Sequence, residues 1–327
     1  MIEADTYMVS VCITTYNMER YIARAIDSVL NQKVKFAVEI LVSDDASSDK
    51  TIDIVKDYQN KYPDKIFLLT ADENKGLISN FVKAINAARG KYIAPLDADD
   101  YWIDDKKLQK QVSCLEKYNE LGFVYTNYYN EDELTGERWL GLPINHQYPD
   151  KDAFLLMLIS PFINMSVPCF RSNLIDQELL ETFVKLNFEA PDLAFFLDFT
   201  FRSKGFFLPE PAVVYTIRGG SMSHQTDFEK KILNYNRCFE IGNYYIQKHN
   251  IQEVVLEKRN FNFRLKLLLT AWETRDFNKV QQYAKPLAIQ DFMSYNKKAL
   301  YIYYASKYKM LFKLFKPWVL RKKTKTF

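Results

Sequence analysis

Apolar segments and amphipathic helical patterns alternate along residues 9–100, and this alternation restricts the possible folds more than any other feature. Four short runs rich in Val, Ile and Leu predict strands at 9–14, 38–43, 66–70 and 92–96. Apolar residues at helical spacing fill the intervals between them, at 21–30, 52–58 and 77–88. Strands and helices in this order predict an α/β domain built on parallel strands.

The fourth strand ends in three carboxylates within four positions, Asp97, Asp99 and Asp100. Parallel strands present their carboxyl ends on one edge of a sheet, which is where open α/β sheets bind ligands. An Asp-x-Asp turn at this edge can hold one divalent cation and leave positions for water and phosphate oxygens. The alternative is a solvated acidic turn that caps the following helix.

Polar residues also follow the first two strands, with Thr14 and Tyr16 after one and Asp44 and Asp45 after the other. An aromatic ring and a carboxylate can bracket a nucleotide base, by stacking and by accepting a ring N–H. Core packing of Tyr16 and a helix-capping turn at Asp45 are the alternatives. Asn17 is expected to cap the first helix.

The chain lacks the glycine loops that usually bind nucleotide phosphates. It has nine glycines, and neither Gly-x-Gly-x-x-Gly nor Gly-x-x-x-x-Gly-Lys-Ser/Thr occurs. A dinucleotide-dependent dehydrogenase and a P-loop ATPase are therefore disfavoured. If a nucleotide binds, a metal must hold its phosphates.

Cysteine and histidine are scattered, which argues against a disulfide framework and a zinc site. Reduced thiols are typical of a cytoplasmic protein. We recognise neither a signal peptide at the N-terminus nor an apolar run of the length that crosses a membrane.

Beyond residue 100 the pattern is less regular. A helix is predicted at 108–118 and a strand at 123–127, whereas the weak periodicity of 128–166 predicts a variable insertion with an aromatic surface at Trp102 and Trp139. Asp192 precedes an apolar helix at 193–201, and a strand follows at 212–217.

Four segments, taken in order and spacing, resemble family 2 glycosyltransferases of the GT-A fold, the bacterial polysaccharide type. They are VSVCITTYN with AIDSVLNQ, ILVSDDASSDKT, NKG through to DADD, and Asp192 with Glu210-Pro211. Together they cover residues 9 to about 223. The resemblance implies a Rossmann-like nucleotide-sugar domain with a mixed central sheet, followed by a C-terminal helical region.

The resemblance also implies how the nucleotide is bound. Thr14, Tyr16 and Asp45 correspond to residues that contact the base, with Asp44 close by. Asp97 corresponds to a residue near the ribose or the sugar.

Further residues carry the implied chemistry. Asp99, helped by Asp100, is implied to bind Mn²⁺ or Mg²⁺ on the diphosphate. Asp192 falls where the family has its catalytic base, and capping of the following helix is the alternative role. Arg218 stands where the family commonly has histidine, and a guanidinium can grip a diphosphate bidentately.

The implied function is inverting, metal-dependent transfer of a hexosyl or N-acetylhexosaminyl group. The donor is expected to be a UDP-sugar and the acceptor a hydroxyl of a glycan or lipid-linked molecule in surface polysaccharide synthesis. Two alternatives stay open at this point, a sugar nucleotidyltransferase and a non-catalytic nucleotide-sugar-binding scaffold. The first would need a glycine-rich basic loop after the first strand, where this chain offers only Arg20.

We predict a transferase domain at 1–225 and a helical appendage at 226–327. The net charge is +3, yet the chain carries ten Lys/Arg and no acid after Asp291. Basic and aromatic residues interleave within 295–327, which suits peripheral contact with the inner face of the cytoplasmic membrane. A helix packed on the domain with a solvated basic tail is the alternative, and nucleic acid binding is not expected.

Overall fold

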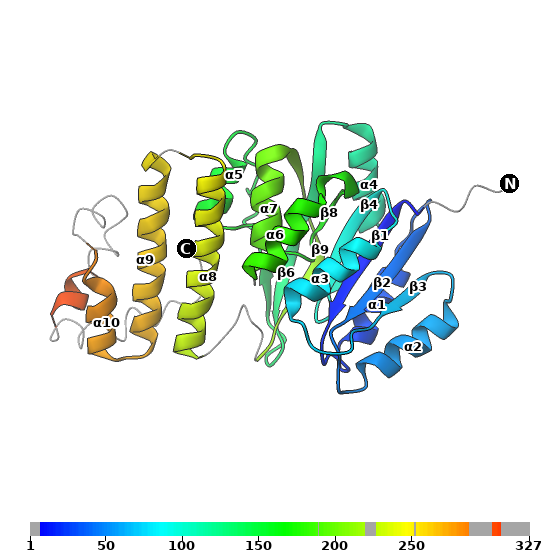
Figure 1. The fold of residues 1–327 in the computed structure, drawn as a ribbon, viewed down its shortest axis with the longest axis horizontal. Coiled ribbons are helices and arrows are strands. Elements are labelled where there is room, and N and C mark those ends of the chain that lie inside the picture. Colours follow the sequence, from blue (N-terminus) through cyan, green and yellow to red (C-terminus); the bar gives the residue numbers. More distant parts are fainter. Residues whose placement is uncertain (1–6, 189, 220–226, 252, 288–302, 309–327) are drawn as a thin grey trace. The chain divides into compact units, whose positions relative to one another are not determined.

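The computed structural model describes residues 7–188, 190–219, 227–251, 253–287 and 303–308 (Figure 1). The chain divides into two compact units, Met1–Arg218 and Gly219–Phe327. The predicted division after residue 225 stays a prediction, because residues 220–226 lie outside the described ranges.

The first unit is built on a nine-stranded mixed sheet, whose main path has the order β3-β2-β1-β4-β8-β6-β9-β5. Its first half is parallel, as predicted. These strands are β1 (Val9–Thr15), β2 (Val38–Asp44), β3 (Ile66–Leu69) and β4 (Tyr92–Asp97). Both β1 and β2 are buried along their whole length, which explains their almost unbroken apolar sequence.

The second half of the sheet makes it mixed. Strand β8 (Pro168–Arg171) is antiparallel to both β4 and β6 (Leu121–Asp132), and β9 (Lys204–Ile217) is parallel to β6. The short β5 (Tyr101–Trp102) pairs with β9, and β7 (Arg138–Leu140) pairs with β6. The predicted α/β class with a mixed central sheet is confirmed.

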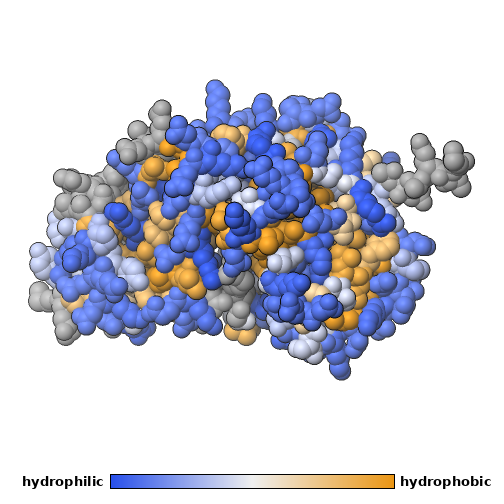
Figure 2. Space-filling view, viewed as in Figure 1, coloured by the Kyte–Doolittle hydropathy of each residue, from blue (hydrophilic) through white to orange (hydrophobic). Residues whose placement is uncertain are grey.

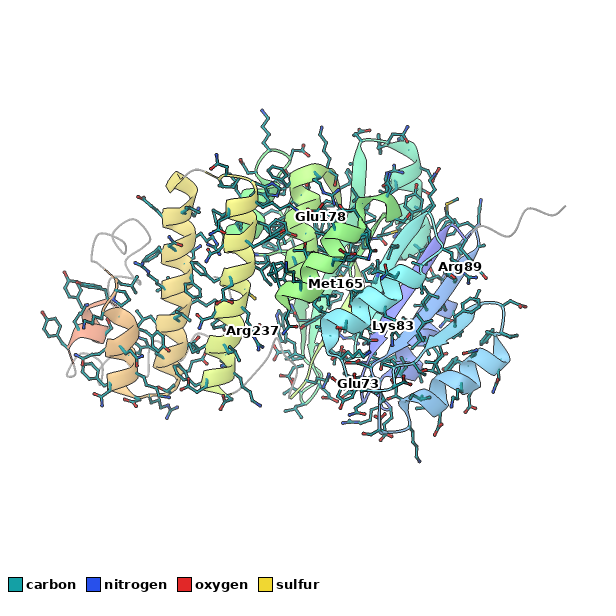
Figure 3. The ribbon with its side chains drawn as sticks, viewed as in Figure 1. Glu73, Lys83, Arg89, Met165, Glu178 and Arg237 are labelled. Carbon is teal, nitrogen blue, oxygen red and sulfur yellow. The ribbon has the colours of Figure 1, made fainter. Side chains whose placement is uncertain are left out.

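Helices cover this sheet, and α3 packs against β1 and β2 (Figure 1). The helices of this unit are α1 (Ile22–Leu30), α2 (Thr51–Lys61), α3 (Leu77–Ala87), α4 (Lys107–Lys117), α5 (Ala153–Ile159), α6 (Gln177–Leu186) and α7 (Pro191–Arg202). Lys83 of α3, labelled in Figure 3, donates to the backbone oxygens of Asp44 and Leu69. The expected cap at Asn17 is wrong: α1 begins at Ile22 after Tyr21, and Asn17 has a positive φ of 53°.

The segment predicted as a variable insertion is mostly loop and turn, but it includes three short regular pieces. It contains the end of β6, β7 and α5, and β8 follows it. Trp102 is no part of an aromatic surface, since its side chain is buried and Nε1 donates to the backbone oxygen of Ser166 over 3.2 Å. Trp139 is exposed as expected.

Two prolines account for an irregular stretch in the longest strand. Thr126 of β6 pairs with Leu208 of β9, but Asn127 pairs with Pro211, so two residues of β9 are skipped in the ladder. A proline has no N–H to donate, and within sheets it is confined to edges and bulges. This irregularity explains why the strand pattern was recognised only from residue 212 onward.

The second unit is helical and consists of α8 (Phe228–Lys248), α9 (Glu253–Glu273) and α10 (Phe277–Ala284). Helices α8 and α9 lie side by side (Figure 1). Ala305, within the short described segment 303–308, is buried in a core with Leu268 and Trp272. The remainder of the predicted membrane-contacting segment, 295–302 and 309–327, lies outside the described residues, and that contact stays a prediction.

The surface drawn in Figure 2 is mostly hydrophilic, with scattered hydrophobic groups. Among the residues that the structure describes, no helix has the length and apolar character needed to cross a membrane.

Lys107 of α4 is fully buried, and its ammonium lies 4.2 Å from the Trp102 ring centre. Burial lowers the pKa of Lys107 to about 7, from an ordinary 10.5. Between these two values the unfolded chain binds the proton and the folded protein does not. The free energy of unfolding should therefore rise as pH increases through this window.

We expect Lys107→Met to flatten this pH dependence, because methionine fills similar space and binds no proton. Urea unfolding at pH 7 and pH 9.5 measures it. Lys106→Met, at the exposed neighbouring position, is the matched control. Equal pH dependence in the two variants would show that Lys107 is charged in the folded protein.

Candidate functional site

The carboxyl ends of β1, β2 and β4 meet at one edge of the sheet. In register, Thr14 lies beside Asp97 of β4, and Thr15 lies beside Asp44 of β2. The Thr14 hydroxyl donates to Asp97 Oδ1 over 3.2 Å. Residues far apart in the sequence are thus placed together by strand pairing alone.

Asp97 is half-buried, and its environment is strongly acidic. Burial, together with the charges of Asp99 and Asp192, raises the pKa of Asp97 to about 7. The Thr14 hydrogen bond and the Arg218 charge act in the opposite direction. The three carboxylates therefore share one electrostatic environment, in which a bound cation would relieve their repulsion.

Asp99 forms an ion pair with an arginine of the same protein. Its Oδ2 accepts from Arg218 Nε over 2.6 Å, in an ion pair that is mostly buried. Arg24 reaches the same residue from α1 and donates to the Asp99 backbone oxygen over 3.2 Å. The Arg24 guanidinium also stacks on the Tyr101 ring, with 3.9 Å between its carbon and the ring centre.

Asp100, which the sequence suggested as a metal ligand, is anchored inside the protein through both of its carboxylate oxygens. Its carboxylate is fully buried: Oδ2 accepts from Ser166 Oγ over 2.6 Å and Oδ1 from the Thr216 N–H over 2.9 Å. Both oxygens face internal donors. These bonds anchor Asp100, and each oxygen keeps a second lone pair, so the metal-binding role expected for Asp99 and Asp100 stays a prediction.

Asp44 and Asp45 organise the loops around this edge. Asp44 accepts from the N–H and the hydroxyl of Ser47, and Asp45 accepts from the N–H groups of Lys75 and Gly76. Both carboxylates are buried. Each is used within the protein, although a carboxylate oxygen has a second lone pair for a further donor. Tyr16 is 44% exposed, so its ring face is open to stacking.

Asp192 lies in the first turn of α7, where Ala190 is the N-cap residue. Its Oδ1 accepts from the Leu193 N–H over 2.8 Å, and burial raises the pKa of Asp192 above its usual range. Tyr128 of β6 lies close enough for the Asp192 and Asp100 charges to raise the pKa of its phenol as well, after burial. The expected alternative, Asp192 as the N-cap, is not what the helix start shows.

Comparison with known proteins decides the family. The sequence model described as Glycosyl transferase family 2 matches residues 10–183, more than half of the chain. The chain belongs to glycosyltransferase family 2. The resemblance inferred from the sequence motifs is thereby confirmed.

Curated relatives of this family 2 glycosyltransferase match about two fifths of its length. The Escherichia coli UDP-Glc:alpha-D-GlcNAc-diphosphoundecaprenol beta-1,3-glucosyltransferase WfgD is 38% identical over 135 residues, 41% of this chain and 51% of its own. An uncharacterized glycosyltransferase of Methanocaldococcus jannaschii is 38% identical over 132 residues, 40% of this chain and 45% of its own. The chain thus spans about half of the length of these relatives.

The fold also has solved counterparts. A crystal structure of S. aureus TarS in complex with UDP-GlcNAc has a TM-score of 0.54 at 17% identity, covering 91% of this chain and 90% of that one. At this identity the similarity concerns the fold alone, and it confirms the GT-A architecture.

The acids of this glycosyltransferase suit a magnesium-type site. Mg²⁺ is usually held by one or two carboxylates, with water and substrate phosphates completing its coordination. Asp99 and Asp97 offer such a pair, and the chain already places a cation on Asp99. Across the described ranges, no cluster of three or more His, Cys, Asp or Glu side chains is arranged to hold a metal by itself.

Three residues of this region were not predicted from the sequence. Ser166 accepts from the Asp97 N–H over 3.1 Å and links it to Asp100, and Arg24 supports Asp99. Tyr128 lies close enough to Asp100 and Asp192 for their charges to raise the pKa of its phenol. Ser166 lies in the weakly periodic segment, which carries no motif. Arg24 resembles any exposed charge on an amphipathic helix, so no sequence signal distinguished it.

We expect Ser166→Ala to lower the free energy of unfolding by about 1–3 kcal/mol, because it leaves buried polar groups of Asp97 and Asp100 without their partner. Urea unfolding at neutral pH measures the change. Ser113→Ala, at an exposed position of α4, is the control and should change stability little. If both variants are equally stable, the Ser166 hydroxyl does not support the acidic turn.

Proposed function

We propose that this protein is an inverting, metal-dependent glycosyltransferase that moves a hexosyl or N-acetylhexosaminyl group from a UDP-sugar to a hydroxyl of a glycan or lipid-linked acceptor. The observation that carries the proposal is the meeting of Asp97, Asp99 and Asp192 in one acidic environment at the sheet edge of a family 2 chain. These carboxylates have separate tasks, as follows.

The donor lies across the carboxyl ends of β1, β2 and β4. Tyr16 stacks on the base and Thr14 contacts it, while Asp97 approaches the ribose or sugar. Asp44 and Asp45 hold the surrounding loops, and Asp45 offers its remaining acceptor capacity to a base N–H. A UDP-sugar is favoured because the name of the WfgD relative specifies UDP-Glc.

Asp192 is the base that removes the proton from the acceptor hydroxyl. A raised pKa makes its carboxylate a stronger proton acceptor, and its partial exposure leaves the carboxylate accessible to an acceptor. With one base and direct attack on the anomeric carbon, the reaction is a single in-line displacement. Such a displacement inverts the configuration at that carbon.

Asp99, assisted by Asp100, would hold the divalent cation. A bound Mn²⁺ or Mg²⁺ supplies neutralisation of the charge that develops on the nucleoside diphosphate. Arg218 lies beside Asp99 and carries a bidentate donor set that suits a phosphate. Arg218 therefore contributes to diphosphate binding when the donor is present.

The acceptor is a glycan or lipid-linked sugar, and the process is surface polysaccharide synthesis at the inner face of the cytoplasmic membrane. Support comes from the printed activity of WfgD, whose acceptor is a sugar diphosphoundecaprenol. WfgD matches 41% of this chain, and this part of the proposal rests on that match.

Asp192→Asn should reduce transfer by on the order of 10²–10⁴-fold and leave nucleotide affinity unchanged, because the amide cannot accept the proton. Sugar transfer is measured alongside calorimetric binding of UDP. Glu178→Gln removes an exposed acid of α6 and is the control (Figure 3). Normal turnover of Asp192→Asn would exclude Asp192 as the base.

Titration with UDP, GDP and dTDP, each with and without Mn²⁺, tests the donor site. We expect metal-dependent binding of UDP, and we expect Asp99→Ala to abolish the metal dependence. Asp152→Asn, which changes an exposed acid before α5, should behave as the wild type. Absence of binding by every nucleotide would contradict the transferase proposal.

A further inference from the structure

A cavity of about 420 Å³ lies between α8 and α9 in the second unit. Its lining comes from facing stripes of the two helices and combines apolar, amide and cationic side chains. The residues are Phe239, Asn243, Ile246 and Gln247 from α8, and Leu256, Arg259, Asn260, Phe263 and Arg264 from α9.

Arg259 is the unusual member of this set, because its side chain is 4% exposed. Its Nη1 donates to Asn243 Oδ1 over 2.8 Å, and its Nη2 donates to the backbone oxygen of Phe239. A guanidinium has five N–H donors, so these bonds leave donor capacity on a group that borders the cavity. Within the described part of the chain, no carboxylate forms an ion pair with Arg259.

Burial lowers the pKa of Arg259 to about 10, which still leaves the guanidinium charged at neutral pH. A buried charge without an opposite charge is costly. Glu240 of α8 and Glu257 of α9 are exposed, and neither forms an ion pair with Arg259 within the described residues. Glu229 and Glu273 pair with Lys279 and Lys231.

The surrounding residues are arranged to keep the guanidinium in place. It lies on the Phe239 ring, 3.9 Å from its centre, and that ring stacks on Phe263 with 4.0 Å between centres. A Cβ added at Gly242 would lie 2.4 Å from Arg259 Nη2. Glycine inside a helix is destabilising relative to alanine, and here it makes room for the charge.

We propose that this cavity binds the phosphate group of a partly apolar molecule, with Arg259 as the buried anchor and Arg264 at the exposed rim. Arginine matches phosphate oxygens bidentately, while Phe239, Phe263, Ile246 and Leu256 contact the apolar part. The phosphate can come from a membrane lipid or from a soluble phosphate ester. The site lies in residues 219–327 and does not depend on the transferase chemistry.

Calorimetry of the full-length protein with hexyl phosphate, inorganic phosphate and hexanol tests the site. We expect hexyl phosphate to bind, inorganic phosphate to bind more weakly, and hexanol not to bind. Arg259→Gln should weaken hexyl phosphate binding by about tenfold or more, and Arg264→Gln severalfold. Lys258→Gln removes an exposed charge from the same helix outside the cavity and should bind as the wild type.

Vesicle sedimentation then separates the two sources of the phosphate. Recruitment to phosphatidylcholine vesicles that contain phosphatidic acid, lost in Arg264→Gln and kept in Lys258→Gln, assigns a lipid headgroup. Binding of hexyl phosphate without such recruitment assigns a soluble ester.

Circular dichroism and thermal unfolding establish whether each variant is folded. If Arg259→Gln does not fold, the binding measurements on Arg264→Gln decide. The proposal is overturned if neither phosphate probe binds the wild type, or if hexanol binds as well as hexyl phosphate. It is also overturned if the folded arginine variants bind hexyl phosphate as the wild type does.

Discussion

The buried carboxylate of Asp100 is the constraint on which the arrangement of the acidic turn depends. Burial and the charges of Asp99 and Asp97 raise its pKa well above the usual range, while the bonds from Ser166 and Thr216 oppose that shift. These two partners lie 66 and 116 residues away in the sequence. One side chain therefore joins the end of β4, the segment before β8 and the end of β9, and a turn fixed in this way gives its neighbour Asp99 a defined position.

The proposed donor site is under electrostatic strain, which suits the proposed binding of a cation and an anion together. Asp97 and Asp99 repel each other, and Asp192 adds a third charge to the same environment. Arg218 offsets part of this repulsion through Asp99. A divalent cation would offset more, and it would free the Arg218 guanidinium for a phosphate. The unfavourable charge of the protein alone thus favours simultaneous binding of metal and diphosphate.

The parts of this structure that could be predicted from sequence are those that depend on local patterns. The runs at 9–14 and 92–96 are buried on both faces, so composition alone marks them as strands, and parallel order then places Thr14 beside Asp97. The buried hydrogen bonds of Asp100 could not be predicted, because Asp99 and Asp100 look alike in sequence and differ only in their distant partners. The second half of the sheet was partly missed for a related reason, since β8 is short and the prolines of β9 interrupt its pattern.

Lys107 and Arg259 show that a buried lysine and a buried arginine differ in whether they can lose their charge. Both are buried, and neither forms an ion pair within the described residues. Lysine can release its proton, and burial lowers the pKa of Lys107 to about 7, so a substantial fraction of the amine is neutral at physiological pH. Arginine keeps its proton at physiological pH. A guanidinium kept in a cavity, on an aromatic ring and beside a glycine that makes room for it, is explained by an anion that enters the cavity rather than by packing alone.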